Sequence, residues 1–296
     1  MSIVYSSRYE IDLGDHIWPT SKYRRIAERL AAERIVDPSS FVEPVPCSWE
    51  DLALVHTAEY LDKVQTSTLT DEEVATLELP WMPGIAEGFR LMTGGTCQAV
   101  SLAVERGAAA HLGGGFHHAF PNHGEGFCLF NDVAVAIRRL QRDDRIRRAA
   151  IVDCDVHHGN GTAVVFERDP TVFTFSIHQQ HNYPVFKPRG DLDIGLDDGA
   201  GDDEYLRRLE PAMAAVIASN PDLVVYVAGA DPFKMDRLGG LRLSFKGLRR
   251  RDRIVFDAAR SAGVPAAVVL AGGYAADIED TVEVHLGTIV EMIARH

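Results

Sequence analysis

An apolar run near the middle of the chain is followed by acids and histidines at a spacing that suits a metal site. The segment Ala149–Gly161 reads A-A-I-V-D-C-D-V-H-H-G-N-G. Its first four residues predict a buried strand of a parallel sheet, with the polar residues at the carboxyl end of that strand. Asp155 and His157 are two residues apart, so an extended backbone would point both in one direction, as half of a zinc site. Asp153 shares this phase and could orient the ligands.

Polar groups also follow three other apolar or glycine-rich segments: His117 and His118, then Asp231, then Tyr274. The carboxyl ends of parallel strands meet at one edge of a sheet, so we expect these groups to lie near the first segment. Each has a plainer interpretation when it is taken alone, since a histidine pair can form a polar turn and an aspartate can cap a helix. The agreement of all these strand ends in type and position favours a common site, because buried charges are paired or bind metal.

The predicted site has the parts of a metal-assisted hydrolase. Asp155, His157 and Asp231 would give three protein ligands, and a catalytic zinc ion uses three while it keeps a position for water. Such an ion lowers the pKa of that water and polarises a carbonyl. His118 or His117 could transfer the proton of the water.

Two further side chains complete this chemistry. The Tyr274 hydroxyl could hold a developing oxyanion, and Asp153 could orient the first histidine of the pair.

Strands and helices alternate along the chain and predict the scaffold of this site. The pattern indicates a single α/β domain over residues 1–296, with three α/β/α layers and a mainly parallel central sheet. The expected strands are 2–6, 108–112, 146–155, 171–177, 222–228 and 264–271. The expected helices are 20–35, 48–65 in short pieces, 71–79, 85–106, 132–140, 162–167, 204–219, 246–262 and 280–295.

Two other segments of the scaffold carry expectations of their own. Gly94 and Gly95 inside the long helix predict close packing against a neighbouring segment, and residues 179–201 are expected to form a long loop.

Composition excludes several classes of function. The chain has 296 residues, is 46% hydrophobic and carries a net charge of −13, which argues against direct nucleic-acid binding and mildly favours cationic substrates. No apolar run is long enough to span a bilayer, and the first residues do not resemble a signal peptide. The four scattered cysteines predict reduced thiols in a cytoplasmic protein.

The ordered motifs resemble one known family. G-G-G-F-H-H-A, G-F-C-L-F-N-D, D-C-D-V-H-H-G-N-G, G-A-D and G-G-Y, together with V-H-T-A-E-Y-L at residues 55–61, are similar to the zinc-dependent histone deacetylase family. That resemblance covers nearly the whole chain and implies the arginase–deacetylase fold. The D-R-L-G-G-L segment at residues 236–241 and the short chain resemble the class IV branch most.

The resemblance also implies roles for individual residues. The zinc ligands would be Asp155, His157 and Asp231. The catalytic group would comprise His117, His118 as the proton shuttle, Asp153 paired with His117, Asn160 behind His118, and Tyr274 at the acyl carbonyl. An acyl-lysine tunnel would be lined by Gly126, Phe127 and Tyr183, with Leu238 at its rim. A potassium ion would be held by Asp153, Asp155, the Ser176 hydroxyl and the carbonyls of His157 and Ile177.

One departure from the pattern concerns Asn160, because many relatives have an aspartate at that place. Asparagine can still accept a hydrogen bond from His118 but adds no charge, so we expect a less basic His118 here. The loop before Tyr183 is also unusual, with Gln179, Gln180 and His181, and it leaves the choice of substrate open.

The sequence therefore predicts a deacylase with one zinc ion per chain and a potassium ion, acting on an acylated lysine. An acetylated polyamine, a small amide or a non-catalytic acyl-binding role are the alternatives. An arginase-like enzyme with two manganese ions would need another acid at the place of Gly159. The oligomeric state stays open.

Overall fold

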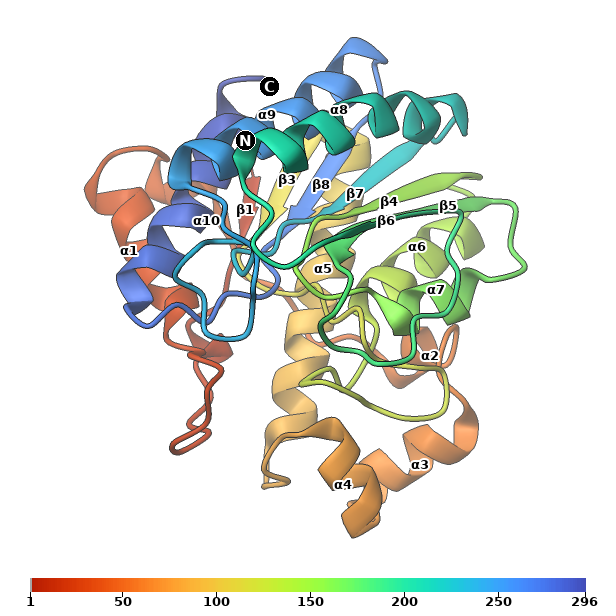
Figure 1. The fold of residues 1–296 in the computed structure, drawn as a ribbon. Helices are drawn as coiled ribbons and strands as arrows, with labels where there is room; N and C mark the ends of the chain where they lie inside the picture. Colours follow the sequence, from red (N-terminus) through yellow and green to blue (C-terminus); the bar gives the residue numbers. More distant parts are fainter. Residues whose placement is uncertain (1) are drawn as a thin grey trace.

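The computed structural model describes residues 2–296 and contains one sheet of eight parallel strands (Figure 1). The strand order is β2-β1-β3-β8-β7-β4-β5-β6. The strands are β1 (Ser2–Val4), β2 (Phe41–Val42), β3 (Ala108–His111), β4 (Ala149–Asp153), β5 (Val172–Gln179), β6 (Leu192–Leu196), β7 (Leu223–Val227) and β8 (Ala266–Val269).

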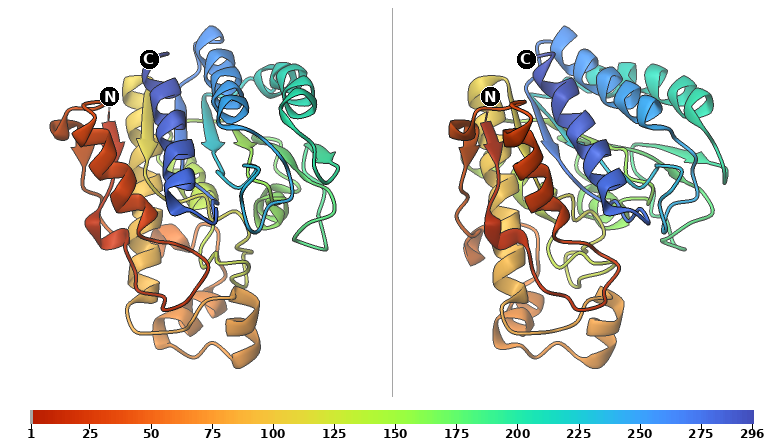
Figure 2. Two further views of the ribbon diagram at one scale, coloured as in Figure 1. Left: turned by 60° about the vertical axis from the view of Figure 1, so that its left-hand side comes forward. Right: turned by 90° about the vertical axis from the view of Figure 1, so that its left-hand side faces the viewer.

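Helices cover both faces of the sheet and complete three layers (Figure 2). One face carries α1 (Lys22–Ala32), α8 (Asp202–Ala218), α9 (Phe245–Ser261) and α10 (Ile278–Ile293). The other carries α5 (Ile85–Arg106), α6 (Asp132–Arg142) and α7 (Asn160–Phe166). The short helices α2 (Trp49–Leu52), α3 (Ala58–Thr66) and α4 (Asp71–Leu77) lie at one end of α5. Single turns of 3-10 helix occupy Ser7–Tyr9 and Pro38–Ser40.

Successive side chains of a strand point to opposite faces of the sheet, so one sheet contributes to two hydrophobic cores. On β4, Ala150 and Val152 pack into one core whereas Ala149 and Ile151 pack into the other. The whole strand is buried, as expected for a parallel sheet covered on both faces. The predicted α/β class and the mainly parallel sheet are therefore confirmed.

The long loop expected over residues 179–201 is wrong in part. Leu192–Leu196 forms the edge strand β6, which pairs with β5 in the register Phe175 to Leu192. The segment is short and contains Gly195 and Asp193, so its own residues give little strand signal. Pairing with an already formed neighbour determines its conformation.

The edge of the sheet that carries the polar motifs is built by consecutive neighbours. Strands β3, β8, β7 and β4 lie side by side in that order, and all run parallel. Their carboxyl ends therefore bring segments that are far apart in the sequence to one place. Among the described residues, no helix combines the length and the apolar character needed to cross a bilayer.

The glycines of α5 pack closely against other segments, as the sequence predicted. A Cβ atom on Gly94 would lie 1.9 Å from the Val45 carbonyl oxygen, and one on Gly95 would lie 2.2 Å from the Tyr9 hydroxyl. Both contacts are far below van der Waals separation, so the helix can approach its neighbours only at glycine.

Replacing Gly94 with alanine should lower the free energy of unfolding by about 1–3 kcal/mol, because the new methyl group meets backbone that cannot rotate away. Gly88→Ala in the same helix is the matched control. Its Cβ would meet only the end of the flexible Ile11 side chain, so we expect a change within about 1 kcal/mol. Urea denaturation of both variants measures the difference, and equal stability of the two would contradict this account of the packing.

Candidate active site

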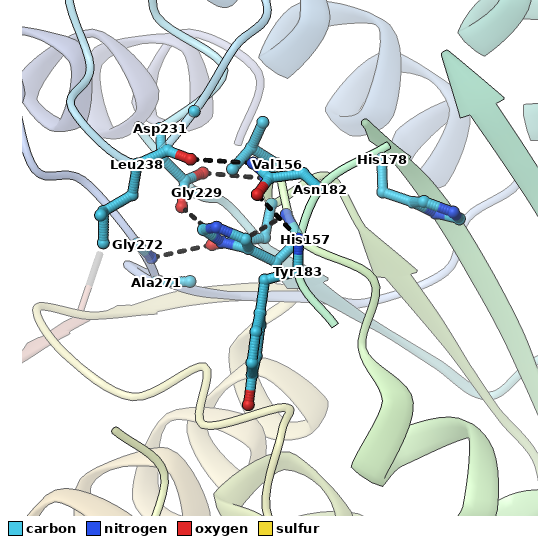
Figure 3. A network of polar contacts seen from close by, with 12 residues as sticks. Val156, His157, His178, Asn182, Tyr183, Gly229, Asp231, Leu238, Ala271 and Gly272 are labelled. Carbon is cyan, nitrogen blue, oxygen red and sulfur yellow. Dashed lines mark hydrogen bonds and ion pairs between the residues drawn. The ribbon is translucent and has the colours of Figure 1, made fainter. Parts of the chain in front are cut away.

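The centre of the site is a buried cluster formed by Asp155, His157 and Asp231. One potential ligand atom from each lies within 4.8 Å of the others, and the three residues are 2%, 8% and 0% exposed. Asp155 Oδ1 accepts hydrogen bonds from the backbone N–H of His157 at 3.0 Å and from its Nδ1 at 3.1 Å. Asp231 Oδ1 accepts one from the backbone N–H of Val156 at 2.9 Å. These contacts hold the three side chains together, as Figure 3 shows for His157 and Asp231.

The cluster fits a metal ion. Asp231 Oδ2 is buried without a hydrogen-bond partner and lies 3.4 Å from His157 Nδ1. Burial and the adjacent Asp155 carboxylate raise the pKa of Asp231, which reflects two acids competing for little positive charge. An ion ligated by both carboxylates and the imidazole would remove that conflict.

Two glycines make room for these carboxylates. A Cβ atom on Gly272 would lie 1.9 Å from Asp231 Oδ2, and one on Gly229 would lie 2.5 Å from Asp155 Oδ2. The backbone N–H of Gly272 also donates to Asp155 Oδ2 at 2.9 Å. The G-A-D and G-G-Y motifs therefore supply space as well as side chains.

The histidine pair lies beside the cluster, and its two rings have different surroundings. His117 Nδ1 is 2.6 Å from Asp153 Oδ2, whereas His118 Nδ1 is 2.7 Å from the Asn160 side-chain oxygen. The two Nε2 atoms are 3.1 Å apart. The sequence-predicted partners Asp153 and Asn160 are thus placed behind the expected histidines.

Electrostatics divides the pair into two unlike groups. Burial alone would lower the pKa of His117, but the Asp153 and Asp155 carboxylates outweigh it and raise that pKa to about 9. Burial lowers the pKa of His118 well below its ordinary value, and the neighbouring His117 and His157 add to this effect. Adjacent titratable groups whose pKa values are shifted in opposite directions are typical of acid–base sites. The effect expected from Asn160, relative to proteins with an aspartate at that place, stays a prediction.

A cavity of about 790 Å³, measured with its open mouth, leads from the surface to these histidines. Gly126, Phe127, Tyr183 and Leu238, which the sequence singled out for substrate binding, all line it. The Phe127 ring meets the Tyr274 ring edge-on at 6.0 Å between centroids, and the Asn182 amide donates to the Leu238 carbonyl oxygen at 2.8 Å. The walls are therefore aromatic and apolar, and polar groups gather at the base.

The residues expected to bind potassium also come together. Ser176 lies opposite Asp153 in the register of β5 and β4, and Ile177 follows it in the buried part of β5. The Ser176 hydroxyl is 2.9 Å from Nδ1 of His178, a ring that points away from the cluster in Figure 3. A potassium ion at this place stays a prediction.

Sequence reasoning did not identify the positioning roles of three residues, of which Lys22 and Asp132 are buried and Asp236 is partly buried. The Lys22 ammonium donates to the Ala271 carbonyl oxygen at 2.7 Å, and burial lowers its pKa to about 8. Asp236 accepts hydrogen bonds from the backbone N–H groups of Leu238 and Tyr274 and so fixes both. Asp132 follows the residue that caps α6. Asp132 and Asp236 lie in the G-F-C-L-F-N-D and D-R-L-G-G-L motifs, whereas no motif marks Lys22.

Asp132 holds the loop that carries the histidine pair. Its carboxylate accepts hydrogen bonds from the backbone N–H of Gly115 at 2.9 Å and of Phe116 at 2.7 Å, and from the Thr96 hydroxyl at 2.5 Å. Asn131, in contrast, caps the helix by accepting from the Ala134 N–H. The two adjacent residues therefore act differently: Asn131 caps the helix and Asp132 holds the loop.

Asp132→Asn should lower the free energy of unfolding by about 1–3 kcal/mol, because an amide can accept on one side only and leaves a buried N–H unpaired. Turnover should fall as well, since the loop leads directly into His117. Asp62→Asn, an exposed change of the same chemistry, should stay within about 0.5 kcal/mol. Denaturation curves and initial rates measure both effects, and a fully stable Asp132→Asn variant would count against this role.

Known proteins resemble both the sequence and the structure. The family model for the histone deacetylase domain matches residues 16–289. The chain is 40% identical to an uncharacterized protein of Picosynechococcus, over 96% of this chain and 95% of the relative. It is 33% identical to histone deacetylase 2 of Arabidopsis thaliana, over 93% and 74% of the two chains.

A solved structure of an HDAC homologue complexed with SAHA matches with a TM-score of 0.86 and 24% identity, over 100% of this chain and 84% of that one. The likeness confirms the predicted fold. The family match and the relative named as a histone deacetylase complete the assignment: the chain belongs to the histone deacetylase family and is an enzyme of the deacetylase class.

Proposed function

We propose that the chain is a zinc-dependent amidohydrolase that removes an acyl group, acetyl or longer, from an amine, with an acyl-lysine side chain as the substrate. The observation that carries this proposal is the buried cluster of Asp155, His157 and Asp231 beside a histidine pair with opposite pKa shifts. Both lie at the base of a cavity that opens to the surface. The family assignment supports the same chemistry.

One zinc ion would be held by Asp155, His157 and Asp231, and when bound it lowers the pKa of a water molecule and polarises an amide carbonyl. The unpartnered Asp231 Oδ2 supports this ligand set. Ser176 and Ile177, with Asp153, Asp155 and His157, would form the potassium site, whose charge would act on the neighbouring histidines.

The proton transfers fall to His118. Its low pKa keeps it neutral at physiological pH, so its Nε2 can take a proton from the attacking water and pass it to the leaving amine. His117, held in its charged form by Asp153, places positive charge beside the reacting carbonyl. The Tyr274 hydroxyl donates a hydrogen bond to the carbonyl oxygen as negative charge develops on it.

The cavity suits an extended aliphatic amine. Phe127 and Tyr183 provide ring surfaces on its walls, and Glu78 adds a carboxylate to the lining. An acidic protein with such a pocket favours a substrate that carries positive charge outside the acyl group. An acyl-lysine meets this description when basic residues flank it in a peptide. An acetylated polyamine meets it through its remaining amines and is the second candidate.

The arginase-like alternative disagrees with the packing at Gly159. A Cβ atom there would lie 2.6 Å from Asp153 Oδ2, so the extra acid that a second manganese ion needs has no room. A non-catalytic binding role disagrees with the complete set of polar groups around the cavity.

The proposal predicts turnover of a small panel of amides by the zinc-loaded enzyme: an acetyl-lysine peptide, a myristoyl-lysine peptide and an acetylated polyamine. At least one should release its acyl group, and a hydroxamate should block that release by competing for the metal. The relative kcat/KM values identify the substrate class. No release from any of them, with the hydroxamate still bound, would instead favour an acyl-binding protein or a small-molecule amide.

Tyr274→Phe is the control that links this turnover to the site. It removes only the hydroxyl, so kcat should fall by about 10²–10³-fold while zinc content is unchanged. Full activity in this variant would contradict the oxyanion role of Tyr274.

A further inference from the structure

A chain of hydrogen bonds runs from His118 away from the cavity and ends at a carboxylate that does not line it. His118 Nδ1 lies 2.7 Å from Asn160 Oδ1, and Asn160 Nδ2 donates to Glu125 Oε1 at 2.7 Å. The Tyr183 hydroxyl donates to the same Glu125 oxygen at 3.0 Å. His123 Nε2 lies 3.4 Å from the other oxygen, Oε2. Glu125 is thus the meeting point of several donors.

These contacts keep Glu125 ionised. Burial would raise its pKa, but the hydrogen bonds from His123, Asn160 and Tyr183 outweigh burial and lower that pKa. An ionised carboxylate accepts hydrogen bonds and donates none. The group of Asn160 that faces Glu125 must therefore be its NH₂, and the group that faces His118 must be its carbonyl oxygen.

This orientation determines where the proton of neutral His118 resides. A carbonyl oxygen can only accept, so His118 must carry its hydrogen on Nδ1. Its Nε2 then has a free electron pair. A hydrogen on His117 Nε2 can be donated to that atom across the 3.1 Å between the two rings. Every link of the chain, from Asp153 at one end to Glu125 at the other, has a consistent donor and acceptor.

We propose that Glu125 is a positioning residue that acts through Asn160 to fix His118 in the tautomer that can accept a proton on Nε2. The inference rests on the proposed role of His118 as the base. In this arrangement the negative charge behind His118 belongs to Glu125, in the glycine-rich loop before Phe127. Asn160 lies between that carboxylate and the His118 ring. Through the Tyr183 hydroxyl, the same carboxylate also holds one wall of the cavity in place.

An exchange of acid and amide between the two positions tests this proposal. In Glu125→Gln either end of the new amide can face Asn160, so Asn160 can turn its NH₂ toward His118 and select the wrong tautomer. We expect kcat to fall by about 10-fold or more, within the roughly 10²–10⁴ that a positioned base contributes, with KM changed by less than about threefold.

Asn160→Asp alone should also be impaired, because it puts two carboxylates where atoms now lie 2.7 Å apart. Its thermal unfolding temperature should drop as well. The double variant Glu125→Gln/Asn160→Asp restores a donor and an acceptor at each contact of the hydrogen-bond chain. The glutamine NH₂ can donate to the aspartate, and the aspartate accepts from His118 Nδ1. Its kcat and its unfolding temperature should both recover most of what the single changes lost.

Glu105→Gln, on the exposed ion pair with Arg145, is the control for the same chemical change and should leave kcat unaltered. Hydroxamate binding measured on every variant shows whether the cavity is intact. Wild-type kcat in Glu125→Gln, or a double variant no more active than the single ones, would overturn the proposal.

A readout on the unaltered enzyme needs no folded variant of Glu125. The ¹⁵N chemical shifts of the His118 ring, assigned by comparison with His118→Ala, distinguish a protonated Nδ1 from a protonated Nε2. The proposal requires hydrogen on Nδ1, and hydrogen on Nε2 in the resting enzyme would contradict it. This result does not depend on turnover, so a failure of the proposed function on all amides would remain distinguishable from a failure of this inference.

Discussion

Two buried carboxylates, Asp155 and Asp231, are held next to each other, and the rest of the site depends on how their charge is balanced. At the separation of the cluster, two like charges repel by about 3–4 kcal/mol if the effective dielectric constant is about 20. One imidazole, His157, can offset only one of them, and Asp231 Oδ2 is left without a hydrogen-bond partner. Gly229 and Gly272 leave room for this arrangement, because a Cβ atom at either position would clash with a carboxylate. The ends of neighbouring strands therefore form a cluster that could hold a cation.

The two histidines of the pair, His117 and His118, lie beside this cluster and have different partners. On one side the Asp153 carboxylate raises the pKa of His117, while on the other burial and the neighbouring histidines lower the pKa of His118, whose Nδ1 lies against the Asn160 side-chain oxygen. The two rings are adjacent in sequence and nearly identical in burial, so only their partners distinguish them. Two copies of the same side chain thus have pKa values shifted in opposite directions by their surroundings.

The sequence predicted those parts of the site whose signals are local. Asp155 and His157 follow one strand in phase, and Asp231 and Tyr274 follow two others, so strand polarity alone brought them to one edge. The Lys22 contact with Ala271 joins residues 249 apart in the chain, and no local pattern marks such a pair. Glu125 was missed for the same reason, since its role exists only when Asn160 folds against it. The edge strand β6 was missed because pairing, more than its own composition, makes it extended.

Some expectations from the sequence and from the family resemblance remain predictions. The class IV assignment, the single-domain organisation, the cytoplasmic location and the potassium ion belong to this group. The described structure is compatible with reduced thiols, because Cys47, Cys97, Cys128 and Cys154 are all buried and free.

The most direct measurement is a zinc titration of the chelator-treated protein, compared with Asp231→Asn and with Asp203→Asn, an exposed control. The account predicts one zinc ion bound per chain in the wild type and in the control, with affinity at least about 100-fold weaker in Asp231→Asn because a ligand is lost. Zinc bound equally well by Asp231→Asn, or no zinc bound by the wild type, would contradict the claim that the buried carboxylates exist to hold a metal.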